Sequence, residues 1–279
     1  MIIDSHCHAW TQWPYQPAVP DPESRASVEQ LLHEMDVNGV DQALIVCAEI
    51  DNNPDNNQFI TEAVRRYPAR LAHVVDIDSM WKPTYHQPGA AARLHRAIER
   101  WQPNGFTHYL NAADDGAWCS SPDGLAFFAA AADAHLIASI HCHPHQQHAI
   151  RTVAQHFPEL PILIHHLGHP RAGDSAHLDA ILASAPYENI FIKISGFYYA
   201  TQSPAWDYPY ADVFPIVRAI YAQFGARRLC WGSDYPVARG FMTYRQALEA
   251  FRTHCDFIPP AERDEILGGT MQRLLRPAD

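Results

Sequence analysis

The sequence predicts a single (β/α)8 barrel, also called a TIM barrel, over residues 1–279. Three observations lead to this prediction. Eight short apolar runs alternate with longer amphipathic segments along the whole chain. A length of 279 residues is typical of one such barrel, and eight strands exceed the usual number in an open doubly wound sheet. The chain also lacks a low-complexity linker or a change of composition that would mark a second domain.

The eight apolar runs have the length and the apolar content of buried strands. The first run, MIIDSH, opens the chain, and the eighth, RLCWGSDY, ends in polar residues. The predicted strands cover residues 1–6, 42–49, 71–78, 105–110, 136–143, 161–168, 189–196 and 228–235.

The segments between the strands place apolar residues at spacings of three and four, which is the pattern of helices that cover a sheet. Pro122 suits the first turn of a helix, and Gly225 can end one. The clearest predicted helices cover residues 27–40, 55–68, 122–135 and 210–225, followed by a closing helix at 259–275. We expect longer loops at residues 11–26 and 78–88.

Composition restricts the function. The formal net charge of -11 argues against binding to nucleic acid or to an anionic membrane, because both depend on clustered Lys and Arg. No apolar run approaches the ~20 residues of a membrane span, and no leader precedes the first strand. The six cysteines lack CxxC spacing, which favours a reducing compartment. We therefore expect a cytoplasmic protein that acts on a small molecule; association into a homo-oligomer is left open.

Histidines and one aspartate end four of the predicted strands. Side chains alternate along a strand, so His6 and His8 share a face, whereas Cys7 points the other way and is expected to pack. The carboxyl ends of all strands in this fold meet at one rim, where active sites form. Imidazole and carboxylate are ligands of Zn²⁺ or a similar divalent ion. An isolated HxH is more often packing than a ligand pair, but four convergent strand ends favour a site built from His6, His8, His141, His143, His165, His166 and Asp234.

Other residues near the strand ends receive no catalytic role. Lys193 precedes the end of the seventh strand and is expected to be structural or to face the substrate. Trp10, Tyr109 and Trp231 are expected to pack, and the DDGAW stretch at 114–118 is expected to form a loop.

Several motifs resemble the amidohydrolase superfamily, and in particular its branch of lactonases and decarboxylases. These motifs are IDSHCHAW, HHLGHP, KISGFYY and WGSDYP. Within that branch, AEIDNNPDNNQFITEAVRRYPARLAHVVDID and ILGGTMQRLL resemble the lactonase group, which includes 2-pyrone-4,6-dicarboxylate lactonases and sugar-acid lactonases. The resemblance covers nearly the whole chain, and its most specific motifs lie in the first and last strands.

The resemblance implies roles for individual residues. His6 and His8 match the metal-binding pair of the first strand, and His166 matches the histidine of the sixth. Asp234 matches the aspartate that takes a proton from the attacking water and can also contact the metal. In HCHP, His143 occupies the place of a ligand in the decarboxylases, while His141 lies two residues earlier on the same face.

The sequence also departs from the family pattern. Some lactonases of this group hydrolyse their substrates without metal, so the HxH motif does not by itself establish a bound ion. Thr107 stands where many relatives have an arginine, so a substrate carboxylate would need another partner, for which Arg171, Arg239 and His141 are the candidates.

These observations predict a hydrolase that opens a carboxylate-derived or sugar-acid-derived lactone by water attack. Asp234 is the expected general base, and His166 orients or polarises the reacting oxygen. A divalent metal, with Zn²⁺ as the first choice, is expected on His6, His8, His143 and Asp234. Two alternatives remain: a metal-dependent non-oxidative decarboxylase with a similar site, and a barrel that binds metal without catalysis.

Overall fold

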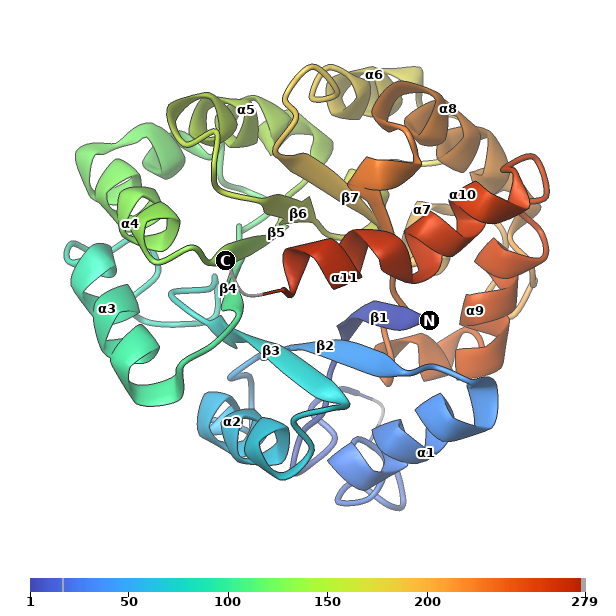
Figure 1. Cartoon of the computed structure of the whole chain (residues 1–279), viewed down its shortest axis with the longest axis horizontal. Helices are drawn as coiled ribbons and strands as arrows, with labels where there is room; N and C mark the ends of the chain where they lie inside the picture. The colour runs from blue at the N-terminus through green and yellow to red at the C-terminus, as the bar shows by residue number, and fades with distance from the viewer. Residues whose placement is uncertain (17, 277–279) are drawn as a thin grey trace.

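The computed structural model of the chain describes residues 1–16 and 18–276. In this part of the chain, eight parallel strands form one sheet in the order of the sequence, and each strand pairs with the next (Figure 1). The predicted barrel is therefore confirmed. The strands are β1 (Ile3–Cys7), β2 (Gln42–Val46), β3 (Leu71–Asp76), β4 (Gly105–Tyr109), β5 (Ile137–His141), β6 (Ile162–Ile164), β7 (Ile190–Ile194) and β8 (Leu229–Trp231).

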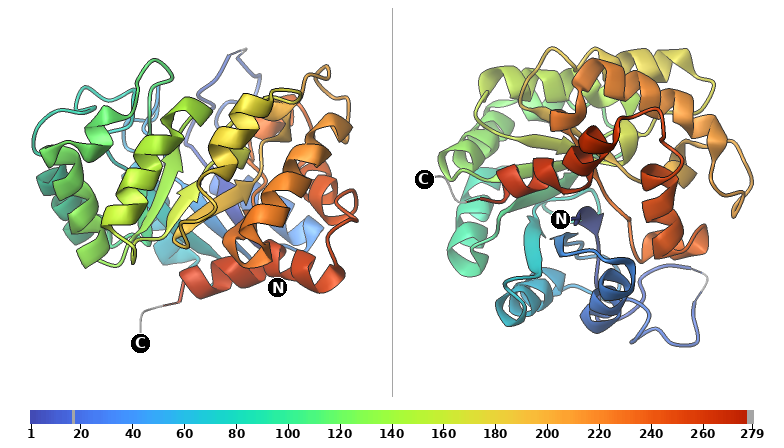
Figure 2. Two further views of the ribbon diagram at one scale, coloured as in Figure 1. Left: turned by 90° about the horizontal axis from the view of Figure 1, so that it is seen from above. Right: turned by 45° about the vertical axis from the view of Figure 1, so that its right-hand side comes forward.

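Most of the helices surround the sheet on its outer side, while the last ones cover one end of it, as the ribbon views show (Figure 2). They are α1 (Val28–Asn38), α2 (Asn56–Arg66), α3 (Ala90–Trp101), α4 (Pro122–Asp133), α5 (Gln147–His156), α6 (Ser175–Leu182), α7 (Phe197–Ala200), α8 (Phe214–Phe224), α9 (Tyr244–Arg252), α10 (Pro260–Asp264) and α11 (Thr270–Leu274). Pro122 lies in the first turn of α4, and Gly225 follows the last residue of α8, as the sequence predicts.

The barrel closes between β1 and the segment that follows β8. The backbone N–H of Asp234 donates to the carbonyl of His6 at 2.7 Å, and that of His8 donates to the carbonyl of Tyr235 at 2.6 Å. Cys7 and Tyr235 also form a parallel bridge. The hydrogen bonds that complete the ring thus hold Asp234 beside the two histidines of the first strand.

Apolar side chains pack on both sides of the strands. The outer layer, between the strands and the helices, contains Phe106 of β4 against Phe127 and Phe128 of α4. Full burial of one large apolar side chain contributes about 1.5–3 kcal/mol. The interior of the barrel is filled by Ile3, Leu44, Val46, Val74, Ile137, Leu163, Cys230 and Met271.

The last helical segment covers the end of the barrel at which the strands begin (Figures 1 and 2). Met271 of α11 packs against Ile3 of β1 in the inner core. The predicted helix at 259–275 is divided by a π-helical turn at Glu265–Gly269. A Cβ on Gly268 would lie 2.2 Å from the carbonyl oxygen of Met1, so glycine permits this close approach. This end is closed, which leaves the opposite rim for a site.

Most of the predicted strands are shorter in the structure, and two of them are shortened most. Residues 161–168 and 228–235 form strands only at β6 and β8. The chain leaves the extended conformation soon afterwards, because His166 and Asp234 adopt positive φ values of 48° and 55°. The described residues of the expected loops at 11–26 and 78–88 form neither helix nor strand, and Pro17 of the first loop lies outside the described residues.

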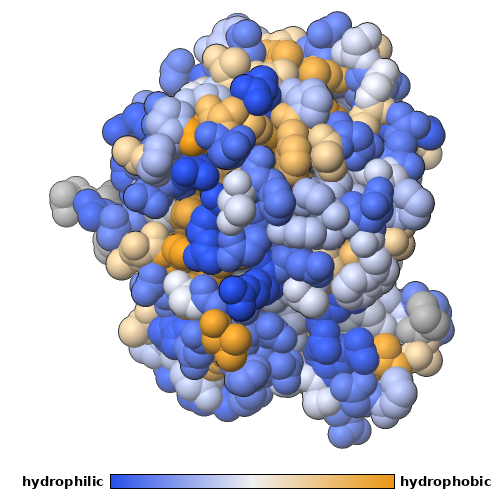
Figure 3. Space-filling model, turned by 90° about the vertical axis from the view of Figure 1, so that its right-hand side faces the viewer, coloured by the Kyte–Doolittle hydropathy of each residue, from blue (hydrophilic) through white to orange (hydrophobic). Residues whose placement is uncertain are grey.

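The outer surface is mainly hydrophilic. The side of the molecule on the right in Figure 1 carries only small, separate apolar patches (Figure 3), as is normal for exposed protein surface. Among the described residues, no helix combines the length and the apolar character that a bilayer span requires.

Candidate active site

His6, His8 and Asp234 converge at the open rim of the barrel. Nε2 of His6 and Nε2 of His8 each lie 3.5 Å from Oδ1 of Asp234. All three side chains are buried. A Cβ on Gly232 would lie 2.7 Å from Cβ of His6, so the glycine in WGSD lets the last strand pass this close to the first.

The three side chains present donor atoms that suit a divalent metal ion. The Nδ1 atom of His8 lies 2.7 Å from the carbonyl oxygen of Val46, which can only accept; Nδ1 therefore carries the proton and Nε2 keeps a lone pair. The buried Nε2 atom of His6 has no hydrogen-bond partner among the described residues. Tetrahedral zinc with bonds of about 2.0–2.1 Å places neighbouring ligand atoms about 3.4 Å apart. The observed 3.5 Å separations fit this requirement.

Lys193 supports His6 from inside the barrel. Its Nζ atom lies 3.2 Å from Nδ1 of His6 and 2.8 Å from Oγ of Ser139. Burial lowers the pKa of Lys193 to about 8. A charged Lys193 can only donate to Nδ1, which places the ring proton of His6 on Nε2, whereas a neutral Lys193 accepts from the Nδ1 proton and leaves Nε2 free to bind a metal. Of the two roles expected from sequence, this contact favours the structural one.

His166 approaches Asp234 from the other side. Its Nε2 atom lies 3.8 Å from Oδ2 of Asp234, and its Nδ1 atom lies 3.0 Å from Oγ of Ser195. Burial lowers the pKa of His166 to about 4, so the ring is neutral at neutral pH. A Cβ on Gly196 would lie 2.7 Å from Nδ1 of His166, which explains the glycine after Ser195.

Asp234 is ionised at neutral pH. Burial raises the pKa of its carboxyl group, but the neighbouring imidazoles of His166 and His8 and a hydrogen bond from Tyr198 together lower it below its ordinary value. Asp234 lies beside His8, which lines the neighbouring cavity, and an ionised carboxylate in that position can accept a proton from a water molecule that reaches it. The geometry therefore permits the general-base role that the sequence suggested.

His165 is a functional candidate to which sequence reasoning gave no specific role. Its Nε2 atom lies 2.7 Å from Oγ of Ser139, and its buried Nδ1 atom has no hydrogen-bond partner among the described residues. His6, His165 and His166 form a second group whose ligand atoms lie close enough to share a metal. The available sequence signal was the adjacent histidine pair at the end of the sixth strand.

The rings of His141 and His143 contact each other, with centroids 5.2 Å apart, but the two residues line different cavities. His141, at the end of β5, stacks on Tyr109 and lines the cavity above His8. The expected metal ligand His143 lies outside both metal-capable groups found among the described residues. The strand ends at His141, and His143 caps the following 3₁₀ turn (Pro144–Gln146), which directs the chain away from the cluster.

The two arginines proposed for substrate binding are also placed differently. Arg171 lines a cavity of 550 Å³ beside His143, His169 and Tyr199. Arg239 lines neither this cavity nor the one above His8. Its guanidinium group donates to the carbonyl of Arg25, and the residue lies in the 3₁₀ turn Val237–Gly240 that follows Pro236. A substrate role for Arg239 does not fit this placement.

The cavity above the cluster has a volume of 450 Å³. Acidic and aromatic side chains from four loops or strand ends surround it. Sequence reasoning missed most of them, because they lie in loops that have no periodic pattern. The lining residues are His8, Tyr15, Ala48, Glu49, Ile50, Asp51, Met80, Trp81, Tyr109 and His141.

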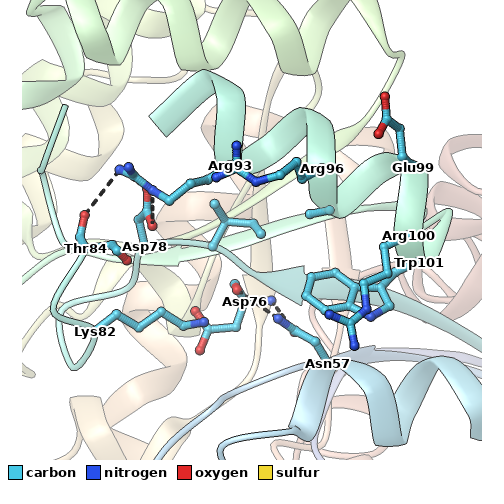
Figure 4. Close-up of a pocket in the computed structure, with 12 residues that line it drawn as sticks. Asn57, Asp76, Asp78, Lys82, Thr84, Arg93, Arg96, Glu99, Arg100 and Trp101 are labelled. Carbon is cyan, nitrogen blue, oxygen red and sulfur yellow. Dashed lines mark hydrogen bonds and ion pairs between the residues drawn. The ribbon is translucent and has the colours of Figure 1, made fainter. Parts of the chain in front are cut away.

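A separate cavity of 610 Å³ lies beside α3 (Figure 4). It contains none of the predicted site residues. Its charged groups largely satisfy one another: Arg93 donates to Asp78 at 2.8 Å, and the amide of Asn57 bonds to the backbone of Asp76. We therefore assign the chemistry to the cluster at the rim.

Tyr198→Phe should lower kcat about 10-fold or more and leave KM nearly unchanged. The hydroxyl of Tyr198 donates to Oδ2 of Asp234, while its ring stacks on Phe241 with centroids 4.3 Å apart. Phenylalanine keeps the packing and removes a hydrogen bond to a charged group, which is worth about 1.5–3 kcal/mol. Steady-state kinetics test this, with Tyr187→Phe, between α6 and β7, as the control. A change confined to KM would show that Tyr198 does not position the carboxylate.

Comparisons with known proteins identify the relatives of this chain. The family model described as Amidohydrolase matches residues 3–276. An L-fucono-1,5-lactonase from Burkholderia ambifaria is 27% identical, over 99% of this chain and 97% of that protein.

Two solved structures share the fold. A zinc-bound amidohydrolase from Burkholderia multivorans superposes with a TM-score of 0.80 at 19% identity, over 99% of both chains. A probable 2-pyrone-4,6-dicarboxylic acid hydrolase from Acinetobacter baumannii, with citric acid bound, superposes with a TM-score of 0.75 at 20% identity, over 98% of both chains. The match of the family model to nearly the whole length shows that this chain belongs to the amidohydrolase family.

Proposed function

We propose that this protein is a lactonase that opens a sugar-acid lactone by water attack, with Asp234 as the general base. One observation carries the proposal: an ionised, buried carboxylate lies 3.5 Å from two imidazoles, and one of these, His8, lines a cavity large enough for a monosaccharide-sized ring. The relative named L-fucono-1,5-lactonase supports the reaction type.

Asp234 takes a proton from water as the water oxygen bonds to the carbonyl carbon of the lactone. His166, held by Ser195, orients or polarises the reacting oxygen. When the tetrahedral intermediate collapses, the bond from the carbonyl carbon to the ring oxygen breaks. Asp234 then returns the proton to that oxygen. The product is a hydroxy acid, which ionises at neutral pH and releases one proton to the solvent.

His6, His8 and Asp234 are the residues that would hold a divalent metal, for which Zn²⁺ is our first choice. When bound, such an ion supplies Lewis-acid polarisation and lowers the pKa of water toward ~7. The fixed tautomer of His8 and the unpartnered Nε2 atom of His6 support this assignment.

The lining of the cavity favours a neutral, hydroxyl-rich substrate. Glu49 and Asp51 offer acceptors for hydroxyl groups, and Trp81 and Tyr109 offer flat apolar surfaces. Among the described residues that line it, none is Lys or Arg. Like charges brought together at a binding site cost several kcal/mol. The carboxylates of this cavity would therefore reject a dicarboxylate substrate. Lys82 pairs with Glu49 from outside this cavity, and Arg171 lines the separate cavity beside His143 and His169.

A substrate panel tests the proposal. Neutral sugar-acid lactones should be hydrolysed with kcat/KM about 10²-fold or more above that of a pyrone dicarboxylate, given the cost of like charges. Proton release and carbon dioxide should be measured together. Proton release without carbon dioxide supports lactone hydrolysis. Carbon dioxide formed from a carboxylated aromatic substrate would establish the decarboxylase alternative. Metal binding without turnover of any substrate would favour a barrel that binds metal without catalysis.

A further inference from the structure

Two histidines meet on the outer side of β4, away from the candidate active site. His108 lies between Thr107 and Tyr109, and the ring of Tyr109 stacks on His141 at the rim. Because side chains alternate along a strand, His108 points to the opposite side. Its ring there contacts Trp118 and Phe127. His108 is buried and meets His86 from the loop that joins β3 to α3.

The second ring nitrogen of each histidine is held by an oxygen acceptor. Nδ1 of His108 lies 3.0 Å from the carbonyl oxygen of Ile77. Nδ1 of His86 lies 3.1 Å from Oδ2 of Asp114, which also accepts a hydrogen bond from the hydroxyl of Tyr85 at 2.8 Å. A carbonyl oxygen and a carboxylate both require a donor, so each Nδ1 carries a proton.

This arrangement leaves two lone pairs facing each other. In the neutral rings the protons are on Nδ1, and the Nε2 atoms of His86 and His108 lie 3.4 Å apart. Two acceptors at that distance repel unless a cation lies between them. A further proton is disfavoured at neutral pH, because burial lowers the pKa of His86 to about 4 and also lowers that of His108.

We propose that His86 and His108 bind a divalent transition-metal ion of the zinc type through their Nε2 atoms. The 3.4 Å separation equals the spacing of about 3.4 Å that two ligands of a tetrahedral zinc ion require. Histidines that bind metals almost always donate their other N–H to a carboxylate or a backbone carbonyl. Here Asp114 and Ile77 supply one of each.

Water would complete the coordination. The side chain of His86 is 15% exposed, so solvent reaches this side of the pair. Two imidazoles are a smaller protein ligand set than the three or four of most zinc sites, which predicts weaker binding than at the rim. The ion would fasten the loop between β3 and α3 to the barrel wall. The same loop carries Met80 and Trp81, which line the active-site cavity.

Zinc stoichiometry tests the site without any substrate. The chelator-treated, full-length protein is titrated with Zn²⁺ and followed by calorimetry. The unaltered protein should bind one more ion per chain than His86→Gln or His108→Gln. The matched control is His95→Gln, an exposed histidine of α3, which should bind as the unaltered protein does. Equal stoichiometry in all four proteins would overturn the proposal.

Crystals of the unaltered protein grown with Zn²⁺ provide a second test that does not depend on how the variants fold. Anomalous scattering at the zinc edge should show an ion between the rings of His86 and His108. Anomalous signal at the rim cluster with none between these rings would overturn the proposal. Failure of the lactonase assignment would leave either result unchanged, because neither measurement involves turnover.

Discussion

Asp234→Asn should reduce turnover by about 10²–10⁴-fold, the usual contribution of a positioned general base. Asparagine has nearly the size of aspartate and can still accept the hydrogen bond from Tyr198, but it cannot take a proton from water. The fold should therefore survive. Steady-state kinetics on the best lactone of the panel, together with circular dichroism, measure both expectations.

The control for this variant is Asp55→Asn. Asp55 is exposed at the start of α2, and its side chain makes no capping hydrogen bond. The activity of Asp55→Asn should therefore equal that of the unaltered protein. Activity of Asp234→Asn within 10-fold of the unaltered enzyme would contradict the general-base assignment. If Asp234→Asn does not fold, Tyr198→Phe tests the same assignment. The hydroxyl of Tyr198 bonds to the Asp234 carboxylate but takes no part in the reaction.

His6→Ala should reduce both metal content and activity. Loss of a residue that only supports a metal ligand typically costs about 10- to 100-fold in affinity or activity, and loss of a ligand should exceed this. The Nε2 atom of His6 lies 3.5 Å from Asp234 and has no other partner among the described residues. Excess Zn²⁺ should restore part of the activity if His6 acts through the metal. Elemental analysis and kinetics at several zinc concentrations test this.

His95→Ala provides the matched control, because it removes the same imidazole from the exposed side of α3. Its metal content and activity should not change. If the unaltered protein is fully active after chelation, with metal well below one ion per chain, the metal-independent mechanism is correct. His6 would then contribute through hydrogen bonding within the cluster, and added zinc would not restore activity.

The sequence by itself determined the barrel and the chemistry of its rim. Alternating apolar runs and amphipathic segments specify strands and covering helices, since each pattern buries apolar surface in only one type of element. Because parallel strands of a barrel end at one rim, HxH in the first strand and Asp234 in the last predict a common site before any contact is known. The structure brings His6, His8 and Asp234 within reach of one another.

The tertiary structure alone decided which of the other polar residues reach that site. His141 and His143 share a face only while the strand continues, and the strand ends at His141. Arg239 lies close to Asp234 in sequence but bonds to the carbonyl of Arg25.

Loop conformation also decided which side chains line the proposed substrate cavity. Glu49, Trp81 and Tyr15 enter it from loops that have no sequence period. The physical reason is that hydrophobic periodicity records which face of an element is buried. The direction in which a loop leaves a strand depends instead on contacts between residues far apart in the chain, such as the bond from Trp10 to the carbonyl of Ala48.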